Sequence, residues 1–241
     1  NIIVKGRPGM LIRFRSALHQ RSLERSITGK RSGIIYFFRK FRILASYDLI
    51  MNTFIKKKII SGSCHYDPGY EVLSGMPGDE YFSFIEENFQ KYLTIPYKEN
   101  VEWILKNPWL VNKDEADKDI ASRYHFSYIS DNFHHFFPVL REEGKITGAA
   151  FFSSRDGVVK SLFIFVLPGS KEKFFMNISS YIENSQSYHS LISFDPQYYL
   201  FLQENVRPTA RIVEVMRYTG VGDPALCELE FTDGDGDSCF T

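Results

Sequence analysis

A short glycine-bearing segment near the start of the sequence has the residue types that bind phosphate. Lys5-Gly6-Arg7-Pro8-Gly9 follows the apolar residues 2–4 and precedes a predicted helix over residues 10–27. Glycines let backbone N–H groups approach an anion, and the positive end of a helix dipole adds to the attraction. We therefore expect a phosphate-bearing cofactor at Lys5, Gly6, Arg7, Gly9 and Met10. The alternative is an ordinary turn between a strand and a helix.

Other residue types with catalytic potential occur without the partners that they would need. His134 and His135 are neighbours in a predicted strand, so their rings should lie on opposite faces and not share a metal ion. The serine hydrolase motif G-x-S-x-G and the zinc motif H-E-x-x-H are both missing. The acidic run 233–238 resembles the first half of a calcium loop but lacks its sixth-position glycine. We predict no metal site.

The elements that must position these residues follow from hydrophobic periodicity and turn chemistry. Strands are also predicted over 33–38 and 43–55. From residue 70 the pattern predicts one strand, two helices, four strands and then helix, strand, helix, strand. The strands are 70–74, 124–129, 134–141, 145–154, 158–166, 188–194 and 211–218, and the helices begin near Asp79, Asn100, Ser170 and Pro196. The fold class predicted is α/β, with a mixed and largely antiparallel sheet flanked by helices.

Charge is distributed unevenly along the 241 residues. Residues 1–60 contain 14 Lys and Arg but only two acids, Glu24 and Asp48, although the whole chain has 29 of each sign. This basic region either packs on the acidic remainder or binds a polyanion, namely a phosphate-rich cofactor, nucleic acid or an acidic membrane surface. No apolar stretch is long enough to span a membrane. Three cysteines without a C-x-x-C pair argue against a disulfide scaffold, so we expect a cytoplasmic protein.

Three segments resemble signatures of the acyl-CoA N-acyltransferases of the GNAT superfamily. Ile35-Tyr36-Phe37-Phe38-Arg39-Lys40-Phe41 resembles the FY-R/K-R/K-FG signature, and Lys5–Gly9 stands where these enzymes carry R/Q-x-x-G-x-G/A. Residues 208–216 are similar to the P-x-x-A-R-I-V-D-V stretch of tandem-unit enzymes of the enhanced-intracellular-survival type. The element order from residue 70 also resembles that fold. The sequence departs from these patterns at Pro8, where the loop has a glycine, and at Phe38, where the general-acid tyrosine stands.

The resemblance implies an N-acyltransferase that uses acetyl-CoA or another acyl-CoA. The Lys5–Gly9 loop would bind the diphosphate, and Tyr36 would replace the missing general acid, the alternative being an aromatic core residue. The acceptor would be a small-molecule or peptide amine. Residues 1–61 would form a basic partial unit, 62–220 a complete GNAT-like unit and 221–241 an acidic tail. The corresponding loop of the second unit, Leu167–Lys171, we interpret as a structural turn because Pro168 lacks an N–H donor.

Two other functions stay open at this point. One is a non-catalytic GNAT-like binding protein whose cofactor loop has degenerated. The other is binding of nucleic acid or an anionic surface through residues 1–60, which follows from the charge distribution alone.

Overall fold

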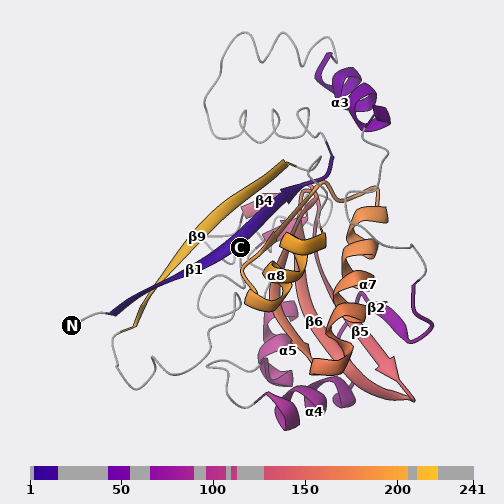
Figure 1. The fold of residues 1–241 in the computed structure, drawn as a ribbon, viewed down its shortest axis with the longest axis vertical. Coiled ribbons are helices and arrows are strands. Elements are labelled where there is room, and N and C mark those ends of the chain that lie inside the picture. Colours follow the sequence, from indigo (N-terminus) through magenta and orange to yellow (C-terminus); the bar gives the residue numbers. More distant parts are fainter. Residues whose placement is uncertain are drawn as a thin grey trace.

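A seven-stranded sheet organises the chain, with the strand order β2-β5-β6-β7-β8-β1-β9 (Figure 1). This computed structural model describes residues 3–15, 43–54, 66–89, 96–106, 110–112, 128–205 and 211–221. Strands β7 and β8 are parallel, and every other neighbouring pair in the sheet is antiparallel. The predicted α/β class with a largely antiparallel sheet is confirmed.

A three-stranded meander forms the middle of the sheet. It consists of β5 (Phe133–Glu142), β6 (Lys145–Arg155) and β7 (Val158–Val166). The two connecting turns have positive φ at both central residues: 52° and 79° at Glu143-Gly144, and 50° and 81° at Asp156-Gly157. Consecutive left-handed residues match the right-handed twist of the flanking strands. Both predicted hairpins are therefore confirmed.

The remaining strands extend this meander on both sides. Strand β2 (Tyr70–Leu73) pairs with β5 at one edge, and β8 (Ser190–Ser193) pairs with β7. Beyond β8 lie β1 (Ile3–Arg13) and β9 (Arg211–Val221), which pair along their full length. A separate parallel pair is formed by β3 (Leu110–Asn112) and β4 (Tyr128–Ser130).

Among the described residues, four helices cover the two faces of the sheet, as side-chain alternation along the strands requires. Helices α4 (Asp79–Asn88) and α5 (Lys98–Lys106) pack with Phe137, Phe151 and Phe165 in one core cluster. Helices α7 (Lys171–Asn184) and α8 (Pro196–Asn205) pack with Phe136 and Phe152 on the other face. A short 3₁₀ turn, η1 (Pro168–Ser170), leads from β7 into α7. These helices were predicted, although α4 has Gly78 at its N-cap and Asp79 as its first residue.

Residues 43–54 form a helix, α3 (Ile43–Phe54), and not the strand that the sequence suggested. The prediction was wrong because isoleucine and tyrosine are common in strands. Spacing was the better signal, since Ile43, Tyr47 and Ile50 repeat at the helical interval. Figure 1 shows α3 beyond one end of the sheet.

The first strand belongs to the same sheet as the rest of the chain. Strand β1 lies between β8 and β9, so residues 3–13 of the predicted unit 1–61 complete a sheet whose other strands come from residues 70–221. The proposed boundary at residue 61 and nearly all of the tail 221–241 lie outside the described residues and stay predictions. Within the described residues, no helix combines the length and the apolar character needed to cross a membrane.

Candidate functional site

The segment predicted as a phosphate loop is part of a continuous strand. Residues 3–13 are extended throughout, and Lys5, Gly6, Arg7 and Gly9 lie opposite Thr219, Tyr218, Arg217 and Val215 of β9. A paired strand directs its successive N–H groups to opposite edges, so they do not gather around one anion. The predicted turn at Lys5–Gly9 and the start of a helix at Met10 are therefore wrong. Tyr36 lies outside the described residues and stays a prediction.

Gly9 and Met10 have packing roles in this strand. A Cβ atom built on Gly9 would lie 2.3 Å from Cδ1 of Phe194 and 2.7 Å from the carbonyl oxygen of Ser193. The glycine therefore lets the chain after β8 approach β1 closely. Met10 is 2% exposed and belongs to the core cluster beneath α7 and α8, so its side chain is not available to an anion.

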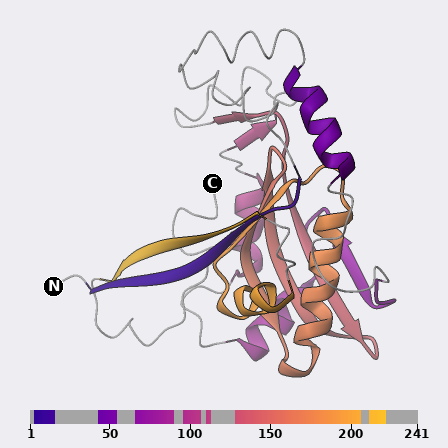
Figure 2. The same cartoon turned by 45° about the horizontal axis from the view of Figure 1, so that its top comes forward.

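The parallel strands β7 and β8 separate soon after they meet. They pair only through Val158–Lys160 and Ser190–Ile192. Beyond Lys160, β7 continues for six residues to Val166 and is paired with β6 alone among the described strands. Strand β8 ends at Ser193, where the chain turns toward α8. Figure 2 shows the result, with the β1–β9 ribbon diverging from the meander.

Two serines and a bulge mark the point where β7 and β8 diverge. The hydroxyl of Ser161 donates a hydrogen bond of 2.7 Å to the hydroxyl of Ser193, and both side chains are buried. The register of β6 and β7 shifts between Phe151 and Phe152, so that Leu162 is an extra residue in β7. A bulge bends a strand and increases its local twist. It therefore helps to turn β7 away from β8.

The diverging part of β7 leads directly to the N-terminus of α7. Leu167 and η1 make this connection, and Ser170 is the N-cap of the helix. Gly169 has open space at its Cβ position, with no heavy atom within 4 Å. The first turn of a helix leaves backbone N–H groups without intrahelical partners, and the helix dipole makes this end positive. This short segment thus has the features that the sequence had suggested for residues 5–10.

One carboxylate already lies beside this helix end. Oε2 of Glu142 accepts a 2.7 Å hydrogen bond from the Ser170 hydroxyl, and its Oε1 lies 3.0 Å from the Lys173 ammonium. Hydrogen bonds from Ser170 and Lys173 lower the pKa of Glu142. Lys173 also pairs with Asp67 at 2.8 Å, and both interactions raise the pKa of Lys173.

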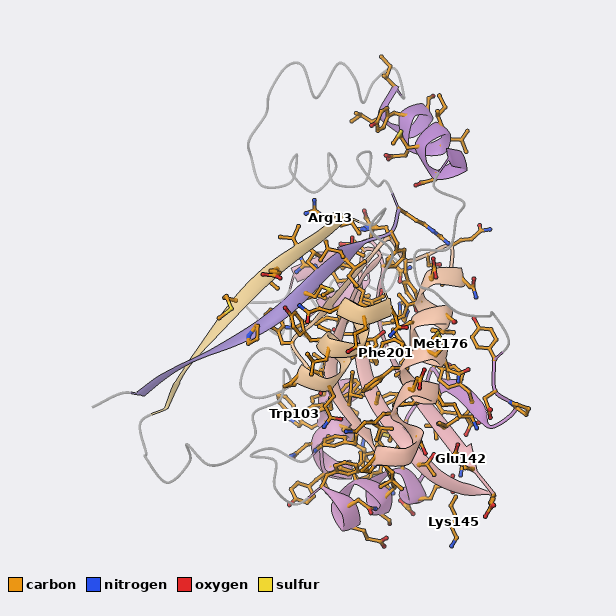
Figure 3. All side chains as sticks on the ribbon, in the orientation of Figure 1. Arg13, Trp103, Glu142, Lys145, Met176 and Phe201 are labelled. Carbon is orange, nitrogen blue, oxygen red and sulfur yellow. The ribbon has the colours of Figure 1, made fainter. Side chains whose placement is uncertain are left out.

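A charged cavity of about 690 Å³ adjoins the same end of the sheet. Its lining includes Arg141, Lys145 and Glu142, and Figure 3 shows Glu142 and Lys145 at this end of the β5–β6 hairpin. The Arg141 guanidinium pairs with Glu71, at 3.0 Å, and with both carboxylate oxygens of Glu80. The hydrogen bonds with Glu80 are the main reason that the pKa of Arg141 is raised. Because these charges already neutralise one another, we interpret the cavity wall as a structural ion-pair network.

His134 and His135 lie at the opposite end of the meander, with their rings on opposite faces of the sheet. His134 Nε2 lies 2.9 Å from the Tyr188 hydroxyl, whereas His135 packs against Phe133 and Phe151 on the other face, as strand alternation predicts. Burial lowers the pKa of His135 to about 4, with a smaller contribution from His134. Among the residues that the structure describes, no three His, Cys, Asp or Glu side chains gather as a metal site.

Sequence reasoning did not predict the divergence of β7 and β8. Leu167–Lys171 was interpreted as a structural turn because of Pro168, and in the structure this segment contains the η1 turn that leads into α7. The topology could have indicated this divergence. Two strands joined by one helix are expected to pair in parallel, and ligands bind where the strands of such a pair separate.

Comparisons with models of known protein families and with curated proteins give no match.

Proposed function

We propose that the protein is an acyl-CoA-dependent N-acyltransferase of the GNAT type, with its cofactor bound where β7 leaves β8. One observation carries the proposal. Strand β7 has no partner on its β8 side beyond Lys160 among the described strands, and it ends at the N-terminus of α7. The element order from β2 to α8 also supports the proposal, because it follows the order that the resemblance implies apart from the additional short strand β3, which pairs with β4 outside the main sheet.

The chemistry of acyl-CoA matches the two parts of this site. Its pantetheine arm is an extended chain with amide groups, and such a chain can add to the edge of a sheet through backbone hydrogen bonds. Its diphosphate would bind at the N-terminus of α7 near Gly169, where N–H groups and the helix dipole attract an anion and where Lys173 offsets the charge of the Glu142 carboxylate. When bound, the acyl-CoA supplies an activated thioester carbonyl for attack by an amine.

The chain's own residues would orient the cofactor. The edge of β7 between Ser161 and Val166 would align the pantetheine arm, and the Ser161–Ser193 hydroxyl pair lies where the strands meet. Gly169 leaves space for a phosphate. The acceptor remains the small-molecule or peptide amine predicted from the resemblance, with Tyr36 as the proposed general acid.

Gly169→Asp tests the cofactor site with little risk to the fold. The new side chain meets open space, and a carboxylate at a helix N-terminus favours the helix. The same carboxylate repels a diphosphate, so we expect acetyl-CoA affinity to fall about ten-fold or more, as measured by isothermal titration calorimetry. Gly75→Asp is the matched control, because Gly75 also has open space and lies outside the site. Its affinity should equal that of the wild type.

Two further measurements separate the alternatives. Lys5→Ala should leave acetyl-CoA affinity unchanged if the site is at α7, and should weaken it if residues 5–9 bind the diphosphate after all. Release of free CoA thiol from acetyl-CoA in the presence of a panel of amines tests transfer. Binding without release would favour the non-catalytic GNAT-like protein. No binding at millimolar acetyl-CoA would refute the proposal.

A further inference from the structure

The β1–β9 ribbon continues beyond the strand that joins it to the rest of the sheet. Strand β8 pairs only with residues 10–13 of β1, so residues 3–9 and 215–221 pair with each other and with no further described strand. Figures 1 and 2 both show this end of the ribbon extending away from the meander and its helices. At about 3.4 Å per residue, these two segments form an arm about 20 Å long.

One face of this arm carries three basic residues and no acid. Alternate residues of a strand share a face, and residues directly opposite each other in an antiparallel pair share it as well. Lys5 and Arg7 therefore belong to the same face as Arg217, which is opposite Arg7. The only acidic residue of either strand, Glu214, is opposite the buried Met10 and belongs to the other face.

Two more arginine positions belong to the basic face at the base of the arm. Arg13 and Arg211 are register partners, each six residues along its strand from Arg7 and Arg217, so they stay on the same face. Figure 3 labels Arg13 at the end of β1. None of the described helices covers this face of β1 and β9. Helices α7 and α8 pack against Met10 on the other face, and the core cluster beneath α4 and α5 contains no residue of either strand.

The arm is poorly stabilised by its own residues. Like charges at directly opposite positions of an antiparallel pair are destabilising, and Arg7 is opposite Arg217 just as Arg13 is opposite Arg211. A ribbon of only two strands is at best marginally stable in water. A ligand with repeated negative charge along this face would remove the repulsion between the arginines.

We propose that the β1–β9 arm binds duplex DNA with its basic face. The major groove of B-form DNA is about 12 Å wide and admits a two-stranded β-ribbon. The strands of the arm lie about 5 Å apart, so the arm is narrow enough to enter this groove. Lys5, Arg7 and Arg217 would then bind phosphates at the edges of the groove and acceptor atoms of the bases.

Geometry and charge favour duplex DNA over other polyanions. The major groove of an A-form RNA duplex is deep and narrow, so it would not admit the ribbon. Binding at an anionic bilayer surface also needs an apolar face that enters the lipid, whereas positions 5, 7, 217 and 219 of the basic face are all polar. The whole chain has 29 basic and 29 acidic residues, so attraction of DNA must come from a local cluster such as this one.

The basic face is separate from the proposed acyl-CoA site. The arm belongs to β1 and β9, whereas the cofactor would bind along β7 and at Gly169. The DNA proposal therefore neither uses nor requires acyl-CoA binding. Failure of one proposal leaves the other unaffected.

Fluorescence anisotropy of the full chain with a labelled DNA duplex tests the proposal. Each phosphate contact contributes about −0.9 to the slope of log K against log salt concentration, so three to five basic residues predict a slope of about −3 to −4.5. Lys5→Gln should weaken binding and make the slope shallower by about 1. Lys106→Gln is the matched control, because Lys106 is an exposed lysine of α5, outside the ribbon. Its affinity and slope should equal those of the wild type.

Urea unfolding supplies a readout that a purely structural role of the arginines would not give. Arg7→Glu replaces a like-charged pair with an opposite-charged one, so its unfolding midpoint without DNA should be higher than that of the wild type. Its DNA affinity should nevertheless fall about ten-fold or more, because the carboxylate repels phosphates. A lower midpoint would overturn the argument from repulsion.

Four results of the binding measurements would overturn the proposal. They are no binding of duplex DNA at low salt, an equal loss of affinity in Lys106→Gln, unchanged affinity in Arg7→Glu, and tighter binding of single-stranded DNA, duplex RNA or anionic lipid vesicles than of duplex DNA.

Discussion

Replacing Gly9 by alanine tests whether residues 5–9 are a packed strand or a ligand loop. The added methyl group would lie 2.3 Å from Cδ1 of Phe194 and 2.7 Å from the Ser193 carbonyl oxygen. Strand β1 cannot simply move away, because Gly9 lies opposite Val215 and the next residue, Met10, lies opposite Ser193. The ring of Phe194 must therefore move.

The expected loss of stability follows from this crowding. Overpacking a well-packed site costs about 1–3 kcal/mol, and the backbone oxygen of Ser193 has less freedom to yield than the ring. Alanine restricts the unfolded chain and returns about 0.5 kcal/mol or slightly more. We expect a net loss of about 2 kcal/mol. With a urea m-value of about 3 kcal/mol/M, the unfolding midpoint should fall by roughly 0.7 M.

Two further variants make this measurement decisive. Gly75→Ala has no heavy atom within 4 Å of the new Cβ and should change stability by less than about 0.5 kcal/mol. Adding Phe194→Leu to Gly9→Ala should cost less than the sum of the two single changes, because the smaller side chain makes room for the methyl group. Wild-type stability in Gly9→Ala, combined with lost acetyl-CoA binding, would refute the packed strand and restore the loop.

Three other predictions concern the two hairpin glycines, the half-buried His135 and the buried Tyr198. Gly144 and Gly157 have φ of 79° and 81°, but only Gly157 would place a Cβ atom against His189, at 2.7 Å. Gly157→Ala should therefore lower the urea unfolding midpoint more than Gly144→Ala. Equal losses would exclude the contact with His189 as the cause. The pKa of His135 is about 4 in the folded protein, below the ordinary value of 6.5, so the unfolded chain binds the proton more readily and stability should fall as the pH drops through this range. We expect His135 to lower the free energy of unfolding by about 2 kcal/mol between pH 7 and pH 5. His135→Phe should abolish that loss in urea titrations at the two pH values, and an unchanged loss in the variant would contradict the assignment. Tyr198→Phe should cost about 1–2 kcal/mol, because its buried hydroxyl shares a 2.8 Å hydrogen bond with Ser179, and the double variant with Ser179→Ala should cost less than the sum of the single changes.

Local signals predicted the meander and most helices. Glu143-Gly144 and Asp156-Gly157 specify their turns because these residues adopt positive φ. That property depends on the residues of the turn itself and not on distant parts of the chain. The helix after Ser170 was likewise recognised from Phe174, Phe175 and Ile178, which repeat at helical spacing and are buried. Such elements can be predicted because the information lies within a few residues.

Long-range contacts account for the errors. The glycine at position 9 suggested a phosphate loop, but its cause is Phe194, more than 180 residues away in the sequence. The divergence of β7 and β8 depends on which strands pair and over how many residues, and no local sequence pattern encodes this. The error at helix α3, by contrast, was local: isoleucine and tyrosine, which are common in strands, outweighed the helical spacing of its apolar residues.

The pairing of β1 with β9 constrains the order of events during synthesis. Among the described strands, residues 3–9 pair only with residues 215–221, so this part of β1 must wait until nearly all of the described chain has been made. Its other neighbour, β8, contacts only Met10–Arg13 and is itself synthesised late. Contacts of such large sequence separation close slowly and leave strand edges exposed meanwhile. A nascent chain paused before residue 211 should therefore be the species most dependent on chaperones.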